Sequence, residues 1–178
     1  MATSNGVQID STMAEITESV AAKLIASGAF QLAKKKRTRV NWENQMAYEY
    51  IEKFYGDHPR WFRIGLGKKP GNDNGNYYNR LMRYADTIIR MPDHILIFEF
   101  KMLCKPDVVA QLLNYKDMFP DTAYFSKYRN EPIKLKVVAA LTDEATKTFI
   151  EKHNIDFELY QPSFYEDWYK KAIQKISE

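Results

Sequence analysis

Apolar and polar residues alternate along two neighbouring segments in the middle of the chain, residues 85–90 and 94–101. Both segments are rich in β-branched and aromatic residues, and the three residues around Pro92 between them form a turn signal. The pattern therefore predicts an antiparallel β-hairpin. The first half of its second strand is apolar on both faces, as in a buried central strand. Because strand side chains alternate with period two, four side chains of that strand share one face: Ile95, Ile97, Glu99 and Lys101.

The same two periodicities predict the elements around this hairpin. Apolar residues at three- and four-residue steps predict amphipathic helices, and short β-branched runs predict strands. The predicted helices are 11–26, 42–55, 106–118, 143–153 and 163–176, and the further strands are 60–67, 134–142 and 156–160. From residue 42 onward, this order predicts an α/β fold with a mixed central β-sheet flanked by helices on both faces.

Composition indicates the number of domains, the compartment and the partners to expect. The chain has 178 residues, 45% of them hydrophobic, which is enough for one domain with a sizeable core. No transmembrane run or signal peptide is visible, so we expect a cytoplasmic protein without a membrane partner. The single cysteine, Cys104, indicates a reducing compartment and is expected to pack rather than react. The net charge of +3 is too small to indicate nucleic acid by itself.

Residues 1–40 are predicted to form an extension before a domain at 41–178. Its amphipathic helix, 11–26, either packs on the domain or binds a partner, which would be another protein or a second copy of the chain. The basic tract at 34–39 either contacts phosphates or is a solvated linker.

The expected chemistry lies on the hairpin. An Asp near the start of one strand and a Glu near the end of its partner can sit side by side, so Asp86 and Glu99 offer Mg²⁺ two oxygen ligands. The carbonyl of Phe100 could supply a third. Lys101 beside them could activate a water or stabilise charge on a phosphate. The alternative is a solvated strand edge whose charges maintain solubility, but a buried carboxylate and ammonium are costly without a function or partner.

Ten residues after Lys101, Gln111 and Tyr115 stand four apart on the 106–118 helix and are expected to share a face. The other side of this helix is expected to carry Val109, Leu112, Leu113 and Lys116. In order and spacing, Asp86, Glu99-x-Lys101 and Gln111-x-x-x-Tyr115 resemble the PD-(D/E)XK nuclease superfamily, in its RecB-like and lambda-exonuclease-like branch. The similarity covers about residues 42–160, and Ala85 departs from it where the motif's name has proline.

This resemblance implies a restriction-endonuclease-like fold and a role for each matching residue. Asp86 and Glu99 would bind Mg²⁺ or Mn²⁺, and Lys101 would be the catalytic lysine. Gln111 and Tyr115 would bind DNA near the scissile phosphate.

In the same resemblance, the helix before the sheet often carries a glutamate that holds the metal through water. Glu43 is the candidate, although a first-turn glutamate also simply favours the helix dipole. Glu49 and Glu52 are expected to face solvent. The buried stripe of this helix is predicted to consist of five residues: Met46, Ala47, Tyr50, Ile51 and Phe54.

Four cations are candidate DNA contacts. Arg80 and Arg83 precede Asp86 and would either clamp a phosphate or pair with a carboxylate. Lys68 and Lys69 begin a loop rich in Gly, Asn and Pro, which would either grip a nucleic-acid strand near the active cleft or form a simple hairpin tip.

Taken together, the sequence predicts a metal-dependent deoxyribonuclease. Two alternatives remain open at this stage. One is a non-catalytic nucleic-acid-binding or assembly protein, such as a component of a phage particle or replication complex, that retains the fold. The other is a toxin or restriction-like endonuclease.

Overall fold

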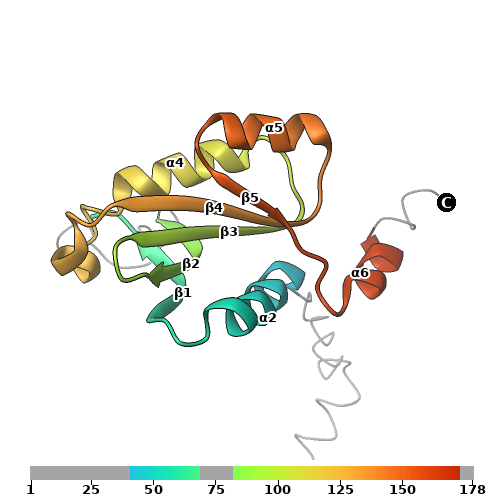
Figure 1. Ribbon diagram of the computed structural model, residues 1–178, viewed down its shortest axis with the longest axis horizontal. Helices are drawn as coiled ribbons and strands as arrows, with labels where there is room; N and C mark the ends of the chain where they lie inside the picture. The colour runs from blue at the N-terminus through green and yellow to red at the C-terminus, as the bar shows by residue number, and fades with distance from the viewer. Residues whose placement is uncertain (1–40, 69–81, 173–178) are drawn as a thin grey trace, which may run out of the picture. The chain divides into compact units, whose positions relative to one another are not determined.

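The computed structural model describes residues 41–68 and 82–172. The expected 11–26 helix, the basic tract, Lys69, Arg80 and the end of the last helix lie outside these residues. The described elements, shown in Figure 1, are α2 (Trp42–Tyr55), β1 (Arg60–Leu66), β2 (Arg83–Arg90), β3 (Ile95–Leu103), α4 (Val108–Met118), the 3₁₀ helix η1 (Ala123–Tyr128), β4 (Ile133–Leu141), α5 (Glu144–Lys152), β5 (Asp156–Leu159) and α6 (Tyr165–Ala172).

The five strands form one mixed sheet in the order β1-β2-β3-β4-β5. The β1–β2 and β2–β3 pairs are antiparallel, and the β3–β4 and β4–β5 pairs are parallel. The predicted hairpin and the predicted mixed sheet are therefore confirmed. β3 lies at the centre, and six consecutive residues from Ile95 to Phe100 are buried, because helices cover both of its faces.

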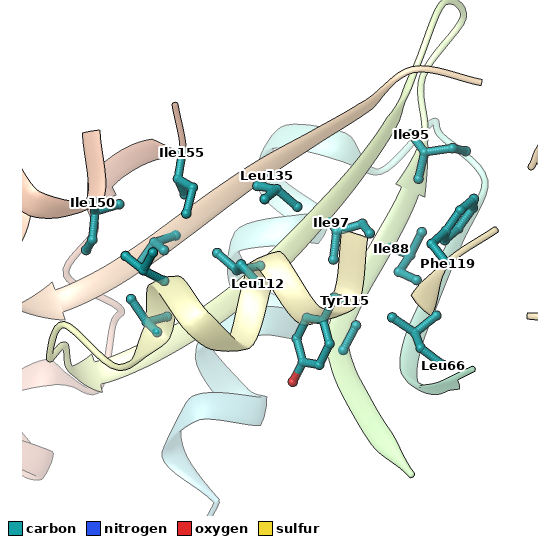
Figure 2. Packing of buried hydrophobic residues seen from close by; sticks show 14 of the residues in the cluster. Leu66, Ile88, Ile95, Ile97, Leu112, Tyr115, Phe119, Leu135, Ile150 and Ile155 are labelled. Atoms are coloured by element: carbon teal, nitrogen blue, oxygen red, sulfur yellow. The ribbon is translucent and has the colours of Figure 1, made fainter. Parts of the chain in front are cut away.

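The two faces of the sheet carry separate hydrophobic layers. On one face Leu112 of α4 and Ile150 of α5 pack in one layer with inward side chains of the strands, such as Ile97 (Figures 1 and 2). On the other face α2 and α6 cover a second layer that includes Phe98 and Trp168. This arrangement is the α/β fold with helices on both faces that the sequence predicts.

Side-chain caps explain where two of the helices begin. Asn41 accepts a hydrogen bond from the backbone amide of Asn44 at 3.1 Å, at the start of α2. Asp143 accepts one from the amide of Thr146 at 2.7 Å, at the start of α5. Both satisfy amides of the first helical turn, which have no partner inside the helix. No helix within the described residues is long and apolar enough to cross a membrane.

Two expectations for α2 are wrong. Phe54 is 48% exposed, because it lies in the last turn and rests on the rings of Tyr50 and Tyr160 instead of entering the core. Glu49 does not simply face solvent, since it accepts hydrogen bonds from the hydroxyl of Tyr160 at 2.6 Å and from the amide of Ser163 at 2.9 Å. It thereby ties α2 to the segment before α6. Glu52 is exposed as predicted, although it pairs with Arg60.

Candidate active site

The candidate site lies where β2 and β3 stop pairing. The ladder between these strands runs from Arg90–Ile95 to Thr87–Phe98, and the next residues along are Asp86 and Glu99. The side chain of Asp86 bridges the opening, because its Oδ2 accepts a hydrogen bond from the amide of Phe100 at 2.9 Å. β3 itself continues, paired with β4 as far as Leu103. The strands therefore separate at the point where the predicted carboxylates stand.

Glu99 is the most tightly enclosed group of the site, with 1% of its surface exposed. Its Oε1 accepts hydrogen bonds from Lys101 Nζ at 2.7 Å and from Gln111 Nε2 at 2.6 Å. Its Oε2 is buried and has no hydrogen-bond partner among the described residues. A buried polar atom without a partner is costly in a folded protein, so it points to a ligand or a functional demand.

Burial and the neighbouring Asp86 raise the pKa of Glu99 to about 8. Burial also raises the pKa of Asp86, against the opposing influence of the Phe100 amide and of the charge on Lys101. Burial acts to lower the pKa of Lys101, but its contact with Glu99 outweighs this and raises that pKa. Two carboxyl groups that resist ionisation thus adjoin an ammonium group that keeps its proton. Three raised pKa values among adjoining groups are characteristic of functional sites.

Two residues of α4 complete a hydrogen-bonded chain across the site. Gln111 Nε2 donates to Tyr115 Oη at 2.6 Å as well as to Glu99, and the Tyr115 hydroxyl donates to the carbonyl of Tyr84 at 2.7 Å. The chain links β3 through α4 to β2. It fixes the side chain of Glu99 from the side opposite to its partnerless oxygen.

The orientation of Tyr115 differs from the sequence expectation. Leu113 and Lys116 are exposed, although they are expected on the side of Val109 and Leu112. Tyr115 is expected on a face apart from these four residues, but it is 1% exposed and packs with Val109 and Leu112 in the core, as Figure 2 shows for Tyr115 and Leu112. The reason is that its ring lies against the sheet while only its hydroxyl reaches the site. The hydroxyl of Tyr115 thereby accepts a hydrogen bond from Gln111, and the expected contact of Tyr115 with DNA stays a prediction.

Asp86 and Glu99 fit a divalent cation. Their charges repel each other and are poorly solvated, and the bare Oε2 of Glu99 is an available ligand. Mg²⁺ is commonly held by only one or two carboxylates, with waters and substrate oxygens as the other ligands. Within residues 41–68 and 82–172, no three His, Cys, Asp or Glu side chains are grouped closely enough to hold an ion together.

Glu43, in the first turn of α2, is near enough to influence the pKa of Asp86, Glu99 and Lys101. It does not form a three-carboxylate cluster with Asp86 and Glu99, so a direct ligand role is not supported. The role through water and the Phe100 carbonyl as a ligand both stay predictions. Phe100 contributes its amide to Asp86, and its ring is buried in the layer beneath α2.

The remaining cations differ in their surroundings. Arg83 begins β2, is exposed, and lines a surface hollow of about 300 Å³ together with Asp107, Gln111 and Asn114. Arg83 therefore lies beside the site, because Gln111 lines the same hollow and donates a hydrogen bond to Glu99. Lys68 is exposed and stands 3.6 Å from Asp121, which gives it a loose carboxylate partner. Cys104 is buried, as expected of a packing residue, and burial raises the pKa of its thiol to about 11.

Sequence reasoning missed one charged residue of the site, Arg63 on β1. Its guanidinium is near enough to Asp86 to act on the pKa of that carboxyl group. Its backbone has a positive φ of 47°, which nothing in the segment RWFRIGL signals. The alternation of β1 indicates a strand, and an exposed arginine within a strand is unremarkable without the structure.

Comparisons with known proteins give a limited result. No protein-family model matches the chain, and no curated protein matches it. Among solved structures, it is similar to EndoMS in its apo form, with 21% identity, 67% of this chain and 46% of that chain covered, and a TM-score of 0.43. A DNA complex of EndoMS has 19% identity, with 66% of this chain and 42% of that chain covered, and a TM-score of 0.42. A repair endonuclease from Pyrococcus abyssi has 20% identity, with 67% of this chain and 47% of that chain covered, and a TM-score of 0.42. The chain spans less than half the length of each of these proteins.

Proposed function

We propose that this protein is a metal-dependent deoxyribonuclease of the PD-(D/E)XK superfamily, which hydrolyses DNA phosphodiester bonds at the opening between β2 and β3. The observation that carries the proposal is the state of Glu99. It is a buried carboxyl group with one bare oxygen, beside Asp86, in contact with Lys101. A purely structural ion pair has no need of the second carboxylate or of the unsatisfied oxygen.

In this proposal Asp86 and Glu99 hold Mg²⁺ or Mn²⁺. When bound, such an ion orients a water, lowers its pKa and neutralises charge on the scissile phosphate. Asp86 is oriented by the Phe100 amide, and Glu99 by Lys101 and Gln111. Both carboxylates are thus set before substrate arrives, which reduces the reorganisation that the reaction would otherwise require.

Lys101 has the dual role expected of the catalytic lysine. Its ammonium group contacts Glu99 at 2.7 Å and is partly exposed at the site, so it can also reach a phosphate oxygen or the attacking water. Because its pKa is raised, it is charged at neutral pH. It would therefore stabilise negative charge that develops on the phosphate, and it would hold the water by hydrogen bonding.

Gln111 and Tyr115 act in this proposal as positioning residues. Gln111 is half-buried, and it sits between Glu99 and the hollow that Arg83 lines, so it is the member of the pair that a DNA strand could touch. Tyr115 holds Gln111 and anchors the arrangement to the backbone of β2. Arg83, exposed beside them, is suited to a phosphate of the same strand.

A cleavage assay tests the proposal. Linear and circular DNA, single- and double-stranded, are incubated with the full chain in Mg²⁺, Mn²⁺ or EDTA, and Asp86→Ala is compared with wild type. Cutting that needs the metal and disappears in the variant is expected, and the circular substrates show whether an end is required. Salt-sensitive DNA binding without any cutting would contradict a nuclease and favour the non-catalytic nucleic-acid-binding module.

A further inference from the structure

The backbone of Arg63 is unusual for its position. Among the described residues other than glycine, only Arg63 and Asn154 have a positive φ, 47° and 56°. Asn154 lies just beyond the end of α5, where asparagine commonly adopts this conformation. Arg63 lies in the middle of β1, where the left-handed conformation strains any residue with a Cβ atom.

The strain occurs directly opposite Asp86. Phe62 pairs with Thr87, and Ile64 with Ala85, so Arg63 and Asp86 are the two residues that face each other between these pairs. No pairing is formed between them. The unusual backbone therefore lies at the same level of the sheet as the candidate metal ligand.

Both strands reverse their side-chain alternation at this level. Trp61 and Ile64 pack against the same hydrophobic layer, as do Ala85 and Ile88, although a spacing of three residues puts strand side chains on opposite faces. The reversal accompanies the turn of the Asp86 carboxylate toward the amide of Phe100 on the next strand. The conformation of Arg63 is thus part of the local geometry that positions Asp86.

Glycine would adopt this conformation without the steric strain, so what arginine adds at the position is its side chain. That side chain is exposed, and within the described part of the chain it forms no hydrogen bond or ion pair. It remains close enough to Asp86 for their charges to interact. An arginine beside a carboxylate pair has the planar, two-pronged donor set that matches a phosphate.

We propose that Arg63 is a phosphate-binding residue, whose guanidinium contacts the DNA strand that is held at Asp86. This assignment rests on the proposed nuclease function and adds a substrate contact from β1, which none of the motif residues occupies. It differs from the proposed contacts of Arg83, which approaches the site from the side of α4.

Arg63→Gly tests the side chain separately from the backbone conformation, because glycine lacks the guanidinium but adopts the left-handed conformation without strain. Arg63→Asn is the second variant, since asparagine also tolerates that conformation. The charge-matched control is Arg129→Ala. Arg129 is exposed and follows η1, near the start of β4, which pairs with the end of β3 remote from Glu99. Binding of a fluorescein-labelled duplex oligonucleotide in EDTA is measured by anisotropy over a range of salt concentrations, and cleavage is measured in Mg²⁺.

The expected result for both Arg63 variants is a melting temperature at or above that of wild type, with DNA binding weakened about tenfold. The slope of log affinity against log salt concentration should fall by about one, which is the signature of a lost phosphate contact. Arg129→Ala should leave affinity and slope unchanged.

Wild-type affinity and salt slope in a folded Arg63→Gly or Arg63→Asn protein would overturn the assignment and leave Arg63 a purely conformational role. The two proposals fail in different ways. A wild-type chain that neither cuts nor binds DNA would overturn both. A wild type that cuts in Mg²⁺, with an Arg63→Gly variant that cuts and binds equally well, would overturn only the role of Arg63.

Discussion

Two glutamate–lysine pairs of equal length lie on opposite faces of the same sheet. Glu99 and Lys101 are 2.7 Å apart at the candidate site, and Glu158 and Lys136 are 2.7 Å apart between β5 and β4. The Glu99 side chain is 2% exposed, whereas that of Glu158 is 37% exposed. Glu158 also accepts a hydrogen bond from the Tyr50 hydroxyl at 2.7 Å, where Glu99 stands beside a second carboxylate.

The two environments drive the carboxyl pKa values in opposite directions. Burial and Asp86 raise that of Glu99 to about 8. Burial of Glu158 is outweighed by its hydrogen bonds from Lys136 and Tyr50, so its pKa is lowered. The same contact thus forms a satisfied structural pair at one place and an unsatisfied group at the other. A functional site is better indicated by a buried carboxyl oxygen without a partner and a raised pKa than by a glutamate–lysine contact.

Removing each lysine should give the largest contrast. Lys101→Ala is expected to leave the protein folded and to lower Mg²⁺-dependent cleavage by about a hundredfold or more, since a positive charge and a hydrogen-bond donor are lost from the reacting centre. Lys136→Ala should leave cleavage unchanged and lower the free energy of unfolding by about 1 kcal/mol or less. Initial cleavage rates and urea unfolding measure both effects. A Lys101→Ala protein that cuts at the wild-type rate would remove the basis of the mechanism.

The two glutamates should also differ in their pH dependence when no metal is present. The pKa of Glu99 is raised on folding, so its ionisation opposes folding, and stability should fall as pH rises from about 4.5 toward about 8. Glu158 has a lowered pKa, so its contribution should be present above about pH 4.5 and lost as pH falls through its lower folded pKa.

In EDTA at pH 8, Glu99→Gln should therefore be more stable than wild type by roughly 1–3 kcal/mol, because it avoids a buried charge but weakens the hydrogen bond from Lys101. The same variant should be inactive. Glu158→Gln should be no more stable than wild type at pH 8. Denaturant unfolding at pH 5 and pH 8 measures these effects, and equal pH profiles for the two variants would contradict the comparison.

The tyrosines of the two regions should give the smallest effects. Tyr115→Phe removes the hydroxyl that joins Gln111 to Tyr84, and Tyr50→Phe removes the donor to Glu158. Each keeps its ring in the core, so each should lose about 1 kcal/mol of unfolding free energy. Only Tyr115→Phe should also slow cleavage, by several-fold, because Gln111 and then Glu99 are less well held. Equal cleavage by both variants would show that this hydrogen-bonded chain has no positioning role.

The parts of the fold that depend on neighbouring residues could be predicted from the sequence. The bounds of α2 are those predicted, and the hairpin of β2 and β3 follows from alternation around a turn. Strand period also predicts that Glu99 and Lys101 share a face, and hairpin pairing predicts that Asp86 lies near Glu99. The turn of Asp86 toward the Phe100 amide was not predictable, because it accompanies the reversed alternation of β1 and β2. The catalytic roles of Asp86, Glu99 and Lys101 stay predictions.

The features that were not predictable depend on distant partners or on backbone detail. Glu49 finds its partners 111 and 114 residues later in the chain, so its environment could not be inferred from α2 alone. The burial of Tyr115 depends on how α4 is rotated against the sheet, which a short helix with several apolar sides does not specify. The positive φ of Arg63 arises from a reversal shared by two strands, and neither strand signals it alone.

We propose that the opening between β2 and β3 binds a divalent cation and that the Glu158–Lys136 pair does not. The most direct measurement is anomalous diffraction from crystals soaked in Mn²⁺ above pH 8, where Glu99 is ionised. We expect a manganese peak between the carboxylates of Asp86 and Glu99 and none beside Glu158. A map with no manganese at Asp86 and Glu99, or with manganese bound at Glu158 instead, would contradict the proposal.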